Sequence, residues 1–160
     1  MKKVIIALAL ALALTASPVM ANDTADIVWE YLTEEMDLSD ACAAGIMGNM
    51  MTEAGGQTLS LNHRAKNKTH YGLCQWSKKY YPKAWKASLN KQLKLLEDTI
   101  EKEFEVFGKC YKKGFDYEDF KNLKSEKKAA RAFAKCYERC GKRSTAKREK
   151  NATKALKAYS

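Results

Sequence analysis

The chain has 160 residues, a net charge of +10 at pH 7, five cysteines and two histidines. Its length suits one domain with a core of its own, and no internal repeat or linker divides it. The cysteines form no CxxC pair, which argues against a zinc site, and the sequence calls for no cofactor.

Residues 1–21 have the layout of a secretory signal peptide. A charged start at positions 2 and 3 precedes an almost unbroken apolar run from Val4 to Ala16. Val19 and Ala21 then place small residues where a signal peptidase requires them. The apolar run is shorter than the ~20 residues of a membrane span. We therefore expect a secreted protein, extracellular or periplasmic, whose domain is residues 22–160 and which keeps no stable membrane anchor after processing.

The mature domain remains strongly basic. Removal of two lysines, with no acid in the same segment, lowers the net charge from +10 to +8. A basic exported protein is suited to anionic polymers, and outside the cytoplasm these are cell-wall polymers rather than nucleic acid. We expect a monomer that acts on such a polymer.

Two helices are expected first along the mature chain. Thr24 to Met36 carries an apolar stripe at helical spacing. Ser39 is a suitable N-cap for a second helix, Asp40 to Thr52, which is apolar or small on nearly every face and should therefore be buried. Gly45 and Gly48 within it indicate close approach by neighbouring elements, because glycine otherwise costs helix stability.

The middle of the chain has a different character. Residues 58–71 lack helical periodicity and predict a loop or small irregular hairpin, and Tyr71 to Trp85 is dense in aromatic residues. A long amphipathic helix follows from Leu89 to Phe107, and then a loop from Gly108 to Gly114.

Three shorter helices are expected towards the C-terminus. They are Asp116 to Leu123, a helix capped by Ser125 that runs to about Cys140, and a Lys- and Ala-rich helix from Ser144 that frays at its end. The predicted fold class is therefore mainly α, with one small irregular loop or hairpin region.

Glu53 is the residue that the pattern of apolar and polar positions along the helices explains least. It ends the buried second helix just before Gly55 and Gly56, and Ile46 and Met50 share its face. We expect a raised pKa for Glu53, because apolar burial and the negative end of the helix dipole both disfavour a charged carboxylate. A carboxyl that stays protonated near neutral pH is what general acid catalysis needs. The alternative is a solvated surface glutamate.

Two sequence motifs resemble the phage tail lysozyme family. They are AGIMGNMMTEAG at Ala44–Gly55 and YGLCQW at Tyr71–Trp76. A third motif of that family matches Tyr137, Glu138 and Arg139, with Cys140 where proline is usual. The resemblance covers about residues 27–141.

This resemblance implies a lysozyme-like fold in which the buried central helix ends in the proton donor, Glu53. It also implies that Gln75 and Tyr71 line a sugar-binding cleft. For Glu138 two roles stay open, substrate binding in the cleft or a buried ion pair with Arg139.

The activity implied is that of a secreted muramidase that cleaves bacterial peptidoglycan between N-acetylmuramic acid and N-acetylglucosamine. We expect Glu53 to act as a single acid, because no Asp or Glu lies between it and Glu97. The alternatives are a lytic transglycosylase with the same acid and a non-catalytic wall-binding module. A cysteine amidase or peptidase based on Cys74 is disfavoured, because no histidine follows that residue.

The odd number of cysteines leaves at least one thiol unpaired in a monomer. Cys110 in a loop and Cys140 in the usual proline position are both additions to the family pattern. We expect them to form a disulfide, with Cys110–Cys136 as the alternative. Cys42 and Cys74 would then be buried thiols or a second pair.

Overall fold

The computed structural model describes residues 24–54, 69–141 and 144–160. The expected signal peptide and most of the expected 58–71 loop lie outside these residues. The described part is helical apart from one two-stranded sheet, which confirms the mainly α fold class. Among the residues described, no helix has both the length and the apolar character needed to cross a membrane.

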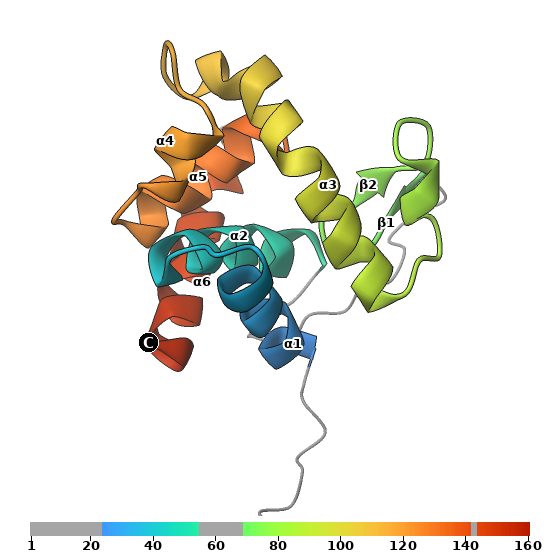
Figure 1. The fold of residues 1–160 in the computed structure, drawn as a ribbon, viewed down its shortest axis with the longest axis horizontal. Coiled ribbons are helices and arrows are strands. Elements are labelled where there is room, and N and C mark those ends of the chain that lie inside the picture. Colours follow the sequence, from blue (N-terminus) through green and yellow to red (C-terminus); the bar gives the residue numbers. More distant parts are fainter. Residues whose placement is uncertain (1–23, 55–68, 142–143) are drawn as a thin grey trace, which may run out of the picture.

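The elements follow in this order: α1 Thr24–Glu30, the π-helical turn η1 Tyr31–Glu35, α2 Asp40–Glu53, β1 His70–Tyr71, β2 Trp76–Ser77, the 3-10 turn η2 Pro82–Ala84, α3 Leu89–Phe107, the 3-10 turn η3 Gly108–Cys110, α4 Tyr117–Lys121, α5 Glu126–Cys136 and α6 Thr145–Tyr159. In the view of Figure 1 the strands lie beyond α3, on the side away from α4 and α5.

Helix α2 is the centre of the fold (Figure 1), and every residue from Cys42 to Met51 is buried. It packs most extensively against α6 and α5. A Cβ added at Gly45 would lie 2.5 Å from the Cβ of Ala129 in α5, and one added at Gly48 would lie 2.5 Å from the backbone N of Ala152 in α6. The expected close approach is confirmed, and each glycine admits one neighbouring helix.

The N-terminal helices differ from the prediction in two details. The first helix widens at η1, where the backbone N–H of Met36 donates to the carbonyl of Tyr31 at 3.0 Å, five residues back. Ser39 precedes α2 as expected, but its hydroxyl makes no capping hydrogen bond.

Helix α5 ends at Cys136 rather than near Cys140. The backbone of Arg139 is left-handed, with φ 51°, which is incompatible with continuation of a right-handed helix. Glu138 therefore lies in the segment after the helix. Ser125 caps α5 as predicted and accepts from the N–H of Lys128 at 3.4 Å.

The end of α6, which was expected to fray, contacts α1 in this structure. The ring of Tyr159 stacks on Trp29 of α1 with centroids 4.7 Å apart, and its hydroxyl donates to Asp26 at 2.6 Å. These contacts join the last helix to the first.

All five cysteines lie in described residues and are free thiols in this structure. Cys110 is exposed, Cys140 is half-buried, and the other three are buried. Cys110 lies near enough to Cys136 to influence the pKa of that thiol. The disulfide between Cys110 and Cys140, or its alternative with Cys136, stays a prediction.

Candidate active site

Glu53 is the last residue of α2, and a quarter of its side chain is exposed. Its Oε1 forms an ion pair with the Nη2 of Arg148, a residue of α6 that is only 2% exposed. The expectation that Glu53 has apolar surroundings is therefore wrong, because the buried guanidinium of Arg148 binds one of its carboxyl oxygens. The helix dipole is unfavourable to the carboxylate at this position, whereas the guanidinium stabilises it.

Arg148 also binds Asn49, which lies one turn before Glu53 on α2. Its Nη1 donates to the Oδ1 of Asn49 at 2.8 Å. The Nδ2 of Asn49 in turn donates to the carbonyls of Gly45 at 2.8 Å and Ala130 at 3.0 Å. One buried amide thus connects the backbones of α2 and α5 to the guanidinium of α6.

A second carboxyl, that of Glu138, lies near Glu53. Its Oε1 is buried and has no hydrogen-bond partner in the part of the chain that is described. Burial, followed by the charge of Glu53, raises the pKa of Glu138 to about 8, against the opposing effects of Arg148 and of a hydrogen bond with Cys74. At neutral pH Glu138 therefore holds a proton beside Glu53.

The predicted ion pair between Glu138 and Arg139 is absent from these described residues. The guanidinium of Arg139 instead lies 4.9 Å from the centre of the Phe107 ring. Both residues line the same hollow, and the charge of Arg139 is among the effects that oppose the rise in the pKa of Glu138. Glu138 lines a hollow with Cys74 and Gln75, and its role in substrate binding stays a prediction.

Gln75 lies with Glu138 and Cys74 along a hollow of about 110 Å³. Gln75 ends the turn between β1 and β2. Tyr71 of β1 pairs with Trp76 of β2 in the two-stranded sheet. The backbone of Gln75 is left-handed, with φ 48°, and its Nε2 donates to the carbonyl of Gly72 at 2.8 Å. Such a conformation is costly for a residue other than glycine and tends to occur at functional sites.

Residues 23–159 match the phage tail lysozyme family. The chain belongs to this family. Membership makes it a lysozyme-like enzyme that degrades peptidoglycan. No curated protein and no solved structure matches the chain. The match extends over α6 and so includes Arg148, which lies beyond the three motifs found in the sequence.

Tyr71 is not among the described residues that line this hollow. Its ring packs against Trp85 with centroids 5.7 Å apart, and the ammonium of Lys78 lies 4.9 Å from the centre of the Trp85 ring. Both rings are half-buried. Tyr71 and Trp85 therefore form an aromatic contact of their own, separate from Gln75 and Glu138.

Trp76 belongs to the hydrophobic core, as expected, with 3% of its surface exposed. Its Nε1 donates to the hydroxyl of Tyr137 at 2.9 Å, and that hydroxyl also shares a hydrogen bond of 2.8 Å with Thr99 of α3. This network joins the hairpin, α3 and the segment that carries Glu138. It sets the positions of Gln75 and Glu138 relative to each other.

Cys74 is poorly suited to be a nucleophile in this family member. Burial, and then the nearby carboxyl of Glu138, raises the pKa of the Cys74 thiol well above its ordinary value. A reactive cysteine needs the opposite shift, because the thiolate is the nucleophile. His70 lines the same hollow, but the electrostatics of Cys74 disfavour the cysteine amidase alternative.

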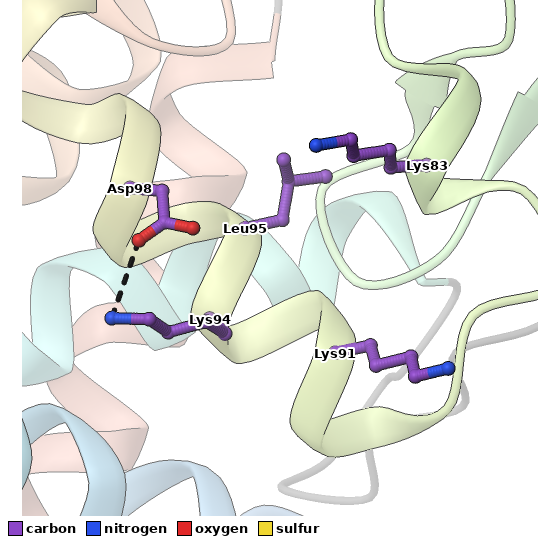
Figure 2. Close-up of a pocket in the computed structure, with 5 residues that line it drawn as sticks. All are labelled: Lys83, Lys91, Lys94, Leu95 and Asp98. Atoms are coloured by element: carbon purple, nitrogen blue, oxygen red, sulfur yellow. Dashed lines mark ion pairs between the residues drawn. The ribbon is translucent and has the colours of Figure 1, made fainter.

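A larger hollow of about 360 Å³ lies between η2 and α3. Figure 2 shows that Lys83 reaches it from one side, while Lys91, Lys94, Leu95 and Asp98 line it from α3. Among the described lining residues Asp98 alone carries a carboxylate, and it pairs with Lys94 at 3.2 Å. No pair of carboxyls comparable to Glu53 and Glu138 is found among the described residues that line this hollow. Within the described ranges, no three His, Cys, Asp or Glu side chains are placed to hold a metal ion.

Arg148 is the site residue that sequence reasoning missed. The residue lies in the helix predicted as Lys- and Ala-rich, among exposed lysines. One signal was present, because Ala152 and Ala155 form a buried stripe that extends back one turn to Arg148. A charged residue on such a stripe indicates a buried partner.

Proposed function

We propose that the protein is a muramidase that cleaves peptidoglycan between N-acetylmuramic acid and N-acetylglucosamine, with Glu53 as the proton donor. Glu53 carries this proposal because it is at once partly exposed and fixed by buried groups. A reacting carboxyl needs access to the substrate and a defined orientation, and few surface glutamates have both. The proposed substrate-binding residues are Gln75 and Glu138, which line one hollow, and Tyr71 in the aromatic contact with Trp85.

The source of the transferred proton follows from the two carboxyls. Burial and the charge of Glu53 raise the pKa of Glu138 to about 8, so Glu138 holds a proton near neutral pH that Glu53 can receive. Transfer of that proton from Glu53 to the glycosidic oxygen would release the leaving sugar. The cationic centre formed on the remaining sugar would then sit beside a site that has become more negative by one charge.

The single-acid mechanism was inferred because no Asp or Glu lies between Glu53 and Glu97 in the sequence. The fold supplies Glu138 from a distant segment, so its role must be tested directly. In our proposal Glu138 stores the proton and Glu53 delivers it, and a water molecule captures the sugar. Capture by the 6-hydroxyl of muramic acid would make the enzyme a lytic transglycosylase.

Purified peptidoglycan tests the proposal. The variant Glu53→Gln keeps a hydrogen-bond acceptor for Arg148 and removes the acidic proton, so we expect an activity loss of about 100-fold or more. Circular dichroism and co-sedimentation with cell walls should stay close to wild type. Glu101→Gln, at an exposed position of α3, is the matched control and should retain full activity.

Three results would change the proposal. Near-wild-type activity of Glu53→Gln would remove Glu53 as the acid. An equal loss in a folded Glu138→Gln variant would make Glu138 an equal partner in catalysis. Wild-type protein that binds walls without releasing products would support the wall-binding alternative. Mass spectrometry of the products distinguishes the two reactions. Hydrolysis leaves reducing ends, whereas transglycosylation leaves anhydro-sugars, which are lighter by one water.

A further inference from the structure

We propose that Arg148 is a positioning residue for the reaction, which holds the Glu53 carboxyl in the orientation needed for proton transfer. This inference rests on the proposed function of Glu53. It assigns a role to α6, the helix that the sequence motifs leave out.

The geometry of Arg148 is that of a fork between two side chains of α2. One terminal nitrogen binds Asn49 at 2.8 Å and the other binds Glu53, while Nε donates to the Oγ of Ser144 at 3.3 Å. A planar guanidinium can serve both α2 partners at once and thereby restricts rotation of the Glu53 side chain. Asn49 is itself fixed by two backbone carbonyls, so the whole chain of contacts is rigid.

The contact leaves part of Glu53 available. Arg148 binds only Oε1, and no hydrogen bond joins the other oxygen to a described residue. Since a quarter of the Glu53 side chain is exposed, one oxygen can be held while the other faces the substrate. This division of the two oxygens is what a positioned acid requires.

Stability alone does not explain a cation at this place. Burial of an ion pair is often no more stabilising than well-packed apolar side chains. The buried stripe of α6 continues from Arg148 through Asn151, Ala152 and Ala155. The helix is also held by the hydrogen bond of Asn151 to Thr52 at 3.1 Å, by the close approach to Gly48 and by the stack of Tyr159 on Trp29. An apolar residue at position 148 would continue that stripe.

Arg148 also acts on the rest of the site. Its charge opposes the rise in the pKa of Glu138 and of the Cys74 thiol. The titratable groups that face it are thus Glu53 from α2, Glu138 from the segment after α5, and Cys74 from the hairpin turn. One buried cation serves both carboxyls, so its removal should disturb orientation and proton affinity together.

The test compares Arg148→Met, Arg148→Lys and Arg131→Gln. Arg131→Gln is the matched control, because it removes an exposed ion pair between α5 and α6, Arg131 with Glu149 at 2.8 Å, without touching the site. We measure kcat and KM on soluble glycan fragments below the melting transition of each variant, per folded molecule. In Arg148→Met we expect kcat to fall about 100-fold, with KM within about threefold of wild type.

Arg148→Lys separates charge from geometry. Lysine keeps the cation but cannot bridge Asn49 and Glu53 as a fork, so kcat should fall by about tenfold. The alkaline limb of the pH profile should stay near its wild-type position in Arg148→Lys. It should move to higher pH in Arg148→Met, because the charge that lowers the pKa of Glu138 is gone.

A folded Arg148→Met variant with a wild-type kcat overturns the proposal, whatever its melting temperature, and so does a loss no larger than that of Arg131→Gln. If Arg148→Met does not fold, Arg148→Lys decides alone, and a wild-type kcat there refutes positioning. The variant Glu53→Gln distinguishes failure of the proposed function from failure of the positioning role of Arg148. Activity in Glu53→Gln defeats the proposed function, whereas an inactive Glu53→Gln beside an active Arg148→Met defeats only this inference.

Discussion

The variant Gly48→Ala tests the central packing of the fold. An added Cβ at this position would lie 2.5 Å from the backbone N of Ala152, 2.6 Å from the carbonyl oxygen of Arg148 and 2.8 Å from the Cα of Ala152. All three atoms belong to the backbone of α6, so no side-chain rotation can relieve the overlap. Helix α6 must move by roughly 1 Å to restore normal contact distances.

Two effects of Gly48→Ala oppose each other. Alanine in place of glycine favours an isolated helix by about 1 kcal/mol. Overpacking of a close-packed core costs about 1–3 kcal/mol, and a clash with backbone atoms belongs at or above the upper end of that range. We therefore expect the free energy of unfolding to fall by about 2 kcal/mol.

Urea denaturation followed by circular dichroism measures this change, with an unaltered m-value as the sign that only stability has changed. Gly141→Ala is the control, because an added Cβ there meets nothing within 4 Å, and its effect should stay within about 0.5 kcal/mol. The folded Gly48→Ala variant should also lose activity, since the displaced carbonyl belongs to Arg148. A variant at least as stable as wild type would refute the packing argument.

Three other predictions concern single side chains. Tyr137→Phe leaves the buried Trp76 Nε1 without its acceptor and should lower the free energy of unfolding by about 1–3 kcal/mol in urea denaturation; an unchanged midpoint would contradict the network. Because the folded pKa of Glu138, about 8, exceeds that of an unfolded glutamate, its stabilising contribution is present in acid and is lost as the pH rises through about 8. Glu138→Gln should therefore be more stable than wild type by about 1 kcal/mol or more at about pH 9 and show no such gain at about pH 4, and equal curves would contradict the shift. In the reduced protein the exposed Cys110 should react with iodoacetamide before the buried Cys42, Cys74 and Cys136. The predicted disulfide of Cys110 is tested separately by a non-reducing peptide map of the exported protein, and a free Cys110 thiol there would refute it.

The sequence by itself determined the features that depend on local periodicity. The bounds predicted for α3, Leu89 to Phe107, are those observed, because an apolar stripe at helical spacing repeats over its whole length. Helix α2 was predicted as buried with Glu53 at its end, and its glycines were predicted to admit neighbours, which Gly45 and Gly48 do. The motif order also indicated the family that the comparison then showed.

Only the tertiary structure brought the site together. Glu53 and Arg148 lie 95 positions apart in the sequence. Hydrophobic periodicity predicts which face of a helix is buried, but it does not predict which residue of another helix contacts that face. Glu138 reaches the site because α5 stops at Cys136 and the chain turns through the left-handed Arg139, a change that the preceding helical pattern did not predict. The electrostatic state of a carboxyl depends on charges and burial contributed by several distant segments. For this reason the sequence could identify Glu53, whereas the cation that holds it and the second carboxyl beside it appear only in the folded chain.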